Sequence, residues 1–237
     1  MRLKFASYNI HKGVGTDGKR DPARIVAVLR ELDADIIALQ EADRRIGERA
    51  SVLKLAALDD TPWRPVDVAK RPRSMGWHGN AILVRRDLQI VDAEAVDLPM
   101  LEPRGAAHAV LQHADRRFRV VGTHLDLSGL RRRDQVKAIV DHVERSDGDL
   151  PAVLMGDFNQ WRLHLGAMEE FEPHDPAGWQ VLDPGRSFPS RQPIAKLDRI
   201  VVSEEWRCID AGVHHSHLSS IASDHLPVWA ELELPAY

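Results

Sequence analysis

The sequence predicts an α/β protein in which two β-sheets pack on each other and helices cover the outer faces. Short strand-like runs of apolar or alternating residues outnumber long amphipathic helices, and Gly and Pro separate the runs as short turns. Many strands with few long helices favour sheet packed on sheet. Polar residues also stand at the ends of several runs, where a plain strand does not require them.

The composition bounds the class of protein. The chain has 237 residues, with 32 Lys or Arg and 36 Asp or Glu, so its net charge is −4, and 43% of its residues are hydrophobic. This is too apolar for a disordered chain. The longest apolar runs, such as Ile36–Leu39, fall far short of the roughly 20 residues that cross a bilayer, so we expect no transmembrane segment. No linker or repeat divides residues 1–237, and we expect a single domain.

The compartment and partners follow from the same inventory. The only cysteine, Cys208, excludes an intramolecular disulfide and a thiolate cage for zinc. Residues 1–5 lead into no sustained apolar stretch of the secretory type. With a single cysteine, we expect a reduced, cytoplasmic compartment. We also expect a monomer. The balanced charge gives no global attraction to nucleic acid, although Lys70–Arg73 and Arg131–Arg133 form local basic clusters.

The N-terminal half alternates strands with helices. Asp21 is a typical helix N-cap and Pro22 a typical first helical residue, and Ile25, Val28 and Leu32 recur on one face of the helix that follows. The other elements expected here are strands at Leu3–Ile10, Asp35–Gln40, Arg64–Ala69 and Asn80–Arg85 and a second helix at Ala50–Leu58.

The C-terminal half begins with a predicted hairpin. Its strands, Ala107–Gln112 and Arg117–His124, are separated by a short polar segment. Apolar residues at helical spacing then predict a helix over Arg131–Glu144. Further strands are expected at Pro151–Gly156, Arg199–Ser203 and Leu226–Leu234.

The polar residues at strand ends predict a single site. Four apolar runs end in polar residues at their C-terminal side, and two others begin with them. If the last two strands run antiparallel to the first four, all these ends meet at one edge of the sandwich. The residues concerned are Asn9, Glu41, His124, Asp157, Asn159, Asp198, Asp224 and His225.

This inventory indicates metal-assisted phosphoester chemistry. Four carboxylates would repel one another if gathered, and because no side-chain cation is expected to compensate them, a metal ion is the natural partner. Carboxylate and amide oxygens suit Mg²⁺ or Mn²⁺ better than zinc. Asp157 and Asn159 point the same way in extended backbone. Two histidines beside a hard cation suit hydrolysis of a phosphoester.

Each residue taken singly also has a purely structural interpretation. Asp and Asn at a strand end commonly cap a turn. Glu41 is compatible with a solvated loop, His124 with a hydrogen-bonded core position, and Asp198 with an ion pair to Arg199. Six independent placements favour a site over coincidence. The tract His214–His217 has no carboxylate at a spacing that would complete a metal site, so it is weak support for one. The His-Glu-x-x-His zinc pattern is absent from the sequence.

Five short motifs occur in order along nearly the whole chain: Ala38–Glu41, Gly122–Leu125, Gly156–Asn159, Leu197–Val201 and Ser223–His225. Together they resemble the motifs of the endonuclease/exonuclease/phosphatase superfamily, which includes DNase I and neutral sphingomyelinases. The resemblance implies a four-layered α-β-β-α sandwich of two packed mixed β-sheets flanked by helices. It also implies divalent-metal-dependent hydrolysis of a phosphate ester.

The resemblance further implies a role for each site residue. Glu41, with Asn9, becomes the principal site for Mg²⁺ or Mn²⁺, and Asp224 binds or orients a metal. Asp157 and Asn159 orient water and phosphate, and His124 contacts the phosphate. His225 becomes the catalytic histidine, held by Asp198. Whether Asp157 or His225 takes the proton of the water stays open. DNase I-like members give the second histidine a carboxylate partner, and the corresponding stretch here, Gly76–Ala81, contains no acid.

The substrate class is the least determined property. A compact, slightly acidic chain with 5% aromatic residues does not predict extensive duplex binding. We therefore expect a phosphodiesterase acting on a small-molecule or lipid headgroup phosphoester. A nuclease acting on DNA or RNA is the alternative, and a non-catalytic binding module on the same fold is the alternative of another class. The candidate substrate-binding residues are Asn80, Arg104, Arg131 and Arg133, the last two at a predicted helix N-terminus.

Overall fold

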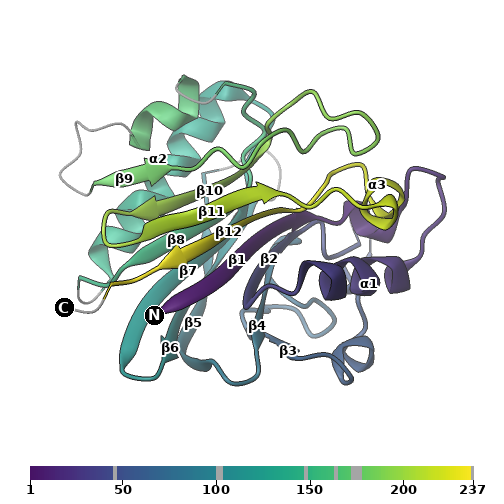
Figure 1. The fold of residues 1–237 in the computed structure, drawn as a ribbon, viewed down its shortest axis with the longest axis horizontal. Coiled ribbons are helices and arrows are strands. Elements are labelled where there is room, and N and C mark those ends of the chain that lie inside the picture. The colour runs from purple at the N-terminus through teal and green to yellow at the C-terminus, as the bar shows by residue number, and fades with distance from the viewer. Residues whose placement is uncertain (45–46, 100–103, 147–148, 163–164, 172–177, 236–237) are drawn as a thin grey trace.

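Two six-stranded mixed β-sheets pack face to face in the computed structural model (Figure 1). The structure describes residues 1–44, 47–99, 104–146, 149–162, 165–171 and 178–235. With helices on both outer faces, this is the four-layered α-β-β-α sandwich that the resemblance implies. None of the helices in these ranges is long and apolar enough to span a bilayer.

The strands follow a different order in space than in sequence. The first sheet contains, from edge to edge, β11 (Arg207–Val213), β12 (Val228–Glu233), β1 (Arg2–Asn9), β2 (Ile36–Gln40), β4 (Ala81–Arg85) and β3 (Trp63–Pro65). The second contains β5 (Gln89–Asp97), β6 (Gly105–His113), β7 (Arg116–His124), β8 (Ala152–Asp157), β10 (Asp198–Ser203) and β9 (Trp179–Val181). The described helices are α1 (Pro22–Leu32), α2 (Gly129–Arg145) and α3 (His217–Ala222), with 3₁₀ turns η1 (His11–Gly13), η2 (Leu55–Leu58) and η3 (Gly166–Phe171).

Apolar side chains fill three interfaces between the layers. Between the sheets, Phe5, Phe118 and Trp206 meet edge to face, with ring centroids 5.3 to 6.0 Å apart, an arrangement that the ring quadrupoles favour. On the outer faces, α1 buries the stripe that includes Ile25 against the first sheet, and α2 buries the stripe that includes Val136 against the second. Figure 1 shows the two helices on opposite sides of the sheets.

Strand direction brings the predicted site residues to one edge. Strand β1 is parallel to β2, and β7 is parallel to β8. In contrast, β12 is antiparallel to β1 and β10 is antiparallel to β8. The C-terminal ends of four strands therefore meet the N-terminal ends of two others, as the sequence analysis expected.

The local predictions hold where a turn or cap specifies them. The Asp21 side chain accepts a hydrogen bond from the Ala23 amide at the start of α1, with Pro22 as the first helical residue. The predicted hairpin is β6 and β7, paired in register from Ala106 opposite Thr123 to His113 opposite Arg116. The helix predicted over Arg131–Glu144 is α2.

The predicted helix over Ala50–Leu58 is wrong. Only η2 is helical there, because the preceding backbone bonds elsewhere: the Ser51 amide donates to the Arg73 carbonyl and the Val52 amide to the Ala42 carbonyl. The sequence analysis also missed β5, β9, β11 and α3. Strands β5, β9 and β11 lie at sheet edges, where exposed polar residues interrupt the alternation that predicts a strand.

Candidate active site

A cleft of about 450 Å³ lies at the edge where the strand ends meet. Glu41 and Asn9 reach it from the first sheet, and His124 and Asp157 reach it from the second. Seven of the residues predicted for the site line it. The lining residues are Asn9, Glu41, Arg104, His124, Leu127, Asp157, Asn159, Trp161, Phe188, Leu197 and His225.

Asp198 lies behind His225. Its Oδ2 atom is 2.9 Å from Nδ1 of His225, and the Ser187 hydroxyl donates to the same oxygen. The Phe188 ring packs against the imidazole with the ring centroids 4.8 Å apart. Burial opposes the charged imidazole, but the attraction of Asp198, its hydrogen bond and the charge of Asp157 together raise the pKa of His225 to about 10. The imidazole is therefore protonated near neutral pH.

Asp157 stands at the centre of the cleft. Its Oδ2 atom accepts a hydrogen bond from the Asn9 amide at 3.0 Å and lies 3.5 Å from Nε2 of His124 and 3.7 Å from Nε2 of His225. Because Asn9 ends β1 and Asp157 ends β8, the Asn9 to Asp157 hydrogen bond also joins the two sheets. One carboxylate oxygen thus faces both histidines of the cleft.

The expectation that Asp157 and Asn159 share an extended backbone is wrong. Strand β8 ends at Asp157, whose Oδ1 accepts the Asn159 amide at 2.9 Å. This is the turn that an Asp side chain favours, and it carries Asn159 into the left-handed region at φ +50°. The Asn159 side chain donates to the Leu125 carbonyl at 2.9 Å. Both residues still line the cleft.

His124 is buried and neutral. Burial is the largest influence on its pKa, and the positive charge of Arg104 adds to it, so that they outweigh Asp157 and Glu41 and lower the pKa to about 4. The carboxylate beside this imidazole belongs to Asp157, at the end of the neighbouring strand β8. The acid-free stretch Gly76–Ala81 therefore does not leave His124 without a carboxylate partner.

Glu41 follows β2 in a left-handed conformation, φ +54°. The Lys12 ammonium donates a hydrogen bond to its Oε2 atom. Burial opposes the charged carboxylate, but the Lys12 hydrogen bond and the attraction of His124 outweigh it and hold the pKa of Glu41 below its usual value. The carboxylate is thus ionised, part-buried and already paired with a cation.

These residues fit a hard divalent ion. The Glu41 carboxylate and the side chains of Asn9 and Asp157 supply oxygen atoms, the donors that Mg²⁺ and Mn²⁺ prefer. The Lys12 ammonium pairs with a Glu41 oxygen and so places a positive charge where a metal ion would bind.

The expectation that no side-chain cation compensates the carboxylates is wrong. Lys12 pairs with Glu41, and the fully buried Arg199 follows Asp198 in β10. Arg199 donates to the carbonyls of Asp198 and Gln160 at 3.3 and 3.2 Å. Burial lowers its pKa, and the charges of the Asp183, Asp198 and Asp157 carboxylates oppose that effect, Asp183 most. The negative charge of the site is therefore balanced in part by the chain itself.

Besides Asp198, four predicted residues lie outside the cleft lining. Asp224 is 3.7 Å from Nδ1 of His11. Asn80 is fully buried and donates to the Gly105 carbonyl at 2.8 Å, so it supports the segment that follows Arg104. On α2, Arg131 lies 4.0 Å from Asp134, and Arg133 pairs with Glu169 and Glu170. The geometry directs both arginines to acids away from the cleft.

Sequence reasoning missed five residues of the site. The residues that were not among the candidates are Lys12, which pairs with Glu41, and the lining residues Leu127, Trp161, Phe188 and Leu197. Leu127 is 73% exposed and Trp161 is 61% exposed, and both line the cleft. Leu127 comes three residues after the motif residue His124, and Trp161 comes two residues after Asn159. This short spacing was the signal in the sequence that could have placed both residues at the site.

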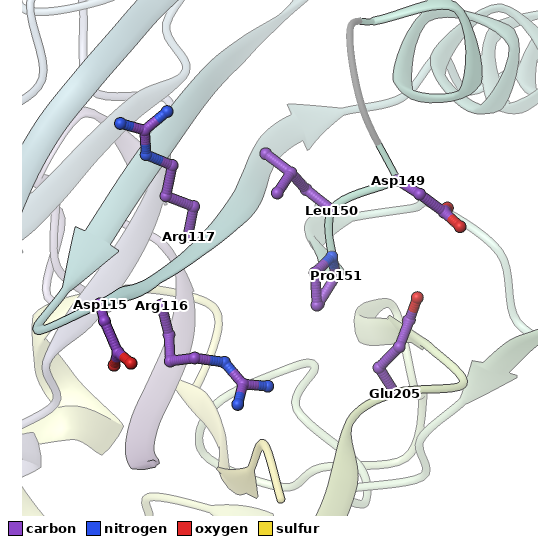
Figure 2. A pocket seen from close by; sticks show the side chains of 7 residues that line it. All are labelled: Asp115, Arg116, Arg117, Asp149, Leu150, Pro151 and Glu205. Atoms are coloured by element: carbon purple, nitrogen blue, oxygen red, sulfur yellow. The ribbon is translucent and has the colours of Figure 1, made fainter. Parts of the chain in front are cut away.

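A second cleft lies at the opposite end of β7 (Figure 2). Strand β7 begins at Arg116, beside this cleft, and ends at His124, in the candidate site. Two arginines and three acidic residues line this second cleft, and none of the predicted site residues does. The lining residues are Asp115, Arg116, Arg117, Asp149, Leu150, Pro151 and Glu205.

Comparison with known proteins identifies relatives over almost the whole chain. The sequence profile of the Endonuclease/Exonuclease/phosphatase family matches residues 6–225. The Escherichia coli K12 protein YbhP is 27% identical over 253 residues, which cover 98% of this chain and 96% of YbhP. An endonuclease/exonuclease/phosphatase from Bacteroides vulgatus superimposes with a TM-score of 0.78 at 18% identity, covering 99% of this chain and 100% of that one. The mannosyl-6-phosphatase Bt3783 of Bacteroides thetaiotaomicron superimposes with a TM-score of 0.76 at 20% identity, covering 98% of this chain and 99% of that one.

Proposed function

Because this chain belongs to the endonuclease/exonuclease/phosphatase family, we propose that it is a divalent-metal-dependent phosphoesterase that hydrolyses a phosphodiester by attack of water. The observation that carries the proposal is the position of Asp157. Its Oδ2 atom faces Asn9, His124 and His225 together. A non-catalytic binding module would not require such a pair of histidines around one carboxylate.

We propose that Glu41 and Asn9 hold Mg²⁺ or Mn²⁺, with Asp224 as a further residue that binds or orients a metal. A hard cation at such a site offsets the charge of a phosphate and lowers the pKa of bound water. Lys12 must leave the Glu41 oxygen for the ion to take its place. The ionised state of Glu41 in the folded chain favours this exchange.

The remaining residues support the following division of roles. Asp157 accepts the proton of the attacking water, because His225 carries a proton near neutral pH and offers no free pair of electrons. The protonated His225, held by Asp198, donates to a phosphate oxygen and stabilises its developing charge. Neutral His124 and the Asn159 amide donate to the other phosphate oxygens, and Arg104 adds positive charge at the cleft.

The substrate that fits this cleft is small. A volume of about 450 Å³ suits one phosphoester and its immediate substituents. Leu127 and Trp161 offer apolar surface at the same cleft to the group beyond the phosphate. A relative in fold, the mannosyl-6-phosphatase Bt3783, is named for a small phosphate ester. We therefore propose a small-molecule or lipid headgroup phosphodiester as substrate. That the chain acts as a cytoplasmic monomer of one domain stays a prediction from its sequence.

A substrate panel with and without Mg²⁺ or Mn²⁺ tests the proposal. It contains bis-p-nitrophenyl phosphate, p-nitrophenyl phosphate, glycerophosphodiesters, phospholipid vesicles and single-stranded DNA. We expect metal-dependent hydrolysis of the diesters, lost with chelator and in Asp157→Asn and retained in Asp115→Asn, which alters the cleft of Figure 2. Preference for DNA would select the nuclease alternative, in which the exposed Trp161 ring stacks on a base. Full activity without metal would overturn the proposal.

A further inference from the structure

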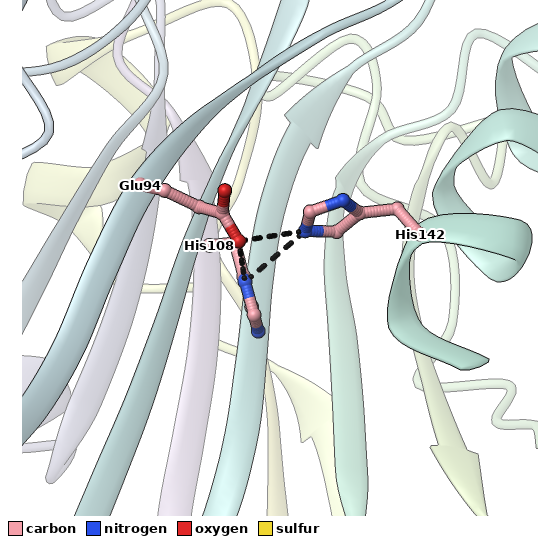
Figure 3. A group of neighbouring side chains, drawn as sticks. All are labelled: Glu94, His108 and His142. Carbon is pink, nitrogen blue, oxygen red and sulfur yellow. Dashed lines mark hydrogen bonds and ion pairs between the residues drawn. The ribbon is translucent and has the colours of Figure 1, made fainter. Parts of the chain in front are cut away.

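Three metal-ligating side chains converge on the outer face of the second sheet, outside the candidate active site (Figure 3). Glu94 of β5 and His108 of β6 are directly opposite in the antiparallel register of these strands. His142 of α2 reaches them from the helix layer above. Because the sheet register and the helix packing fix all three positions, the cluster is built by three separate elements of the fold.

The spacing of the three ligand atoms matches a tetrahedral ion. His108 Nδ1 lies 3.1 Å from Glu94 Oε1 and 3.2 Å from His142 Nε2, and His142 Nε2 lies 3.1 Å from the same Glu94 oxygen. Ligands about 2.0 to 2.2 Å from a tetrahedral metal are roughly 3.3 to 3.6 Å from one another. The three atoms therefore form a nearly equilateral triangle that needs only a small expansion to hold an ion.

The chemistry of the donors selects the kind of metal. Two imidazoles and one carboxylate are a ligand set that zinc uses in proteins, whereas the active site offers oxygen donors. His108 is buried, and its Nδ1 atom faces the other two ligand atoms. Among the residues that the structure describes, Nε2 of His108 has no hydrogen-bond partner. The contacts of this buried imidazole therefore run through Nδ1, toward Glu94 and His142.

The cluster is open to solvent on one side. Glu94 and His108 line a cleft of about 420 Å³, so water can complete the coordination. The side chains of Glu94 and His142 are partly exposed, which gives an ion an entry path.

We propose that Glu94, His108 and His142 form a binding site for Zn²⁺ or a similar transition-metal ion, separate from the Mg²⁺ or Mn²⁺ site of the cleft. The bound ion joins β5, β6 and α2 and stabilises the folded chain, because the ligands are assembled only in the native state. In the metal-free protein the three side chains hold one another by hydrogen bonds. This inference does not depend on the proposed phosphodiesterase activity.

Metal titration of the full chain tests the site. In saturating Mg²⁺, we expect one Zn²⁺ to bind by calorimetry and to raise the thermal unfolding midpoint. Co²⁺ in place of Zn²⁺ is expected to give the intense visible absorption of tetrahedral coordination, which an oxygen-rich octahedral site lacks. His142→Ala and Glu94→Gln should weaken Zn²⁺ binding by at least about 100-fold. Loss of a residue that only orients a ligand weakens metal binding by up to about 100-fold, and loss of a ligand itself should cost at least as much.

Matched variants keep the outcome interpretable. His113→Ala removes another histidine of β6, outside the cluster, and should leave Zn²⁺ binding unchanged. Circular dichroism of His142→Ala and Glu94→Gln without Zn²⁺ checks that both fold, and their Mg²⁺-dependent hydrolysis should equal that of the wild type. Equal Zn²⁺ affinity in the wild type and both cluster variants would overturn the proposal, as would a Co²⁺ spectrum of octahedral type.

Discussion

Asp198 and His225 share a buried hydrogen bond across the two sheets, with 2.9 Å between Oδ2 and Nδ1. Asp198 begins β10 of the second sheet, and His225 lies in the segment just before β12 of the first. The antiparallel pairing of these strands with β8 and β1 brings both residues to the cleft. The pair therefore exists only when the sandwich is assembled.

Loss of the imidazole should slow hydrolysis strongly. We expect His225→Ala to reduce kcat by about 10² to 10³-fold, the usual scale for loss of a hydrogen-bond donor that stabilises charge in the transition state. Asp198→Asn should reduce kcat to a smaller extent, because the imidazole remains but loses its charged partner. Steady-state hydrolysis of bis-p-nitrophenyl phosphate with Mg²⁺ measures both. The exposed His215→Ala is the control, and wild-type turnover in His225→Ala would refute the assigned role.

The same hydrogen bond predicts how stability depends on pH in the metal-free protein. The pKa of His225 is raised from 6.5 to about 10, so the folded state binds the proton more tightly than the unfolded state. This stabilisation is fully present below pH 6.5 and is lost as the pH rises through about 10. Urea unfolding across this range should show a steeper loss of stability in the wild type than in Asp198→Asn. Parallel curves for the two proteins would contradict the prediction.

Glu41 and its neighbour Lys12 predict opposite effects on metal binding. Glu41→Gln removes the charge of the proposed ligand and should weaken Mg²⁺ or Mn²⁺ binding in calorimetry while the fold is retained. Lys12→Met removes the ammonium that competes for the same oxygen, so its Mg²⁺ affinity should be at least that of the wild type. If Glu41→Gln binds Mg²⁺ as the wild type does, Glu41 is not a ligand.

The arginines near the cleft are expected to contribute unequally to substrate binding. Arg104 lines the cleft, whereas Arg133 pairs with Glu169 and Glu170. Arg104→Ala should raise KM for an anionic diester several-fold, and Arg131→Ala and Arg133→Ala should change it little. Measuring KM at low and high salt separates a direct contact from a general effect of charge. A larger rise in Arg133→Ala than in Arg104→Ala would reverse the assignment.

The sequence by itself determined the features that depend on near neighbours. A cap such as Asp21, the hairpin of β6 and β7 and the alternation of buried strands are set by residues a few positions apart, so their patterns are visible in one dimension. The ordered motifs also indicated the family and placed polar residues at strand ends. From strand direction alone, these ends were expected at one edge.

Only the tertiary structure decided which charges meet. Lys12 and Glu41 are 29 residues apart, and Glu94 and His142 come from different layers of the fold. The amides of residues 51 and 52 bond to distant carbonyls instead of forming a helix. Packing of the two sheets and their helices determines these contacts. No local pattern encodes them, because their free energy depends on burial and distance in the folded chain.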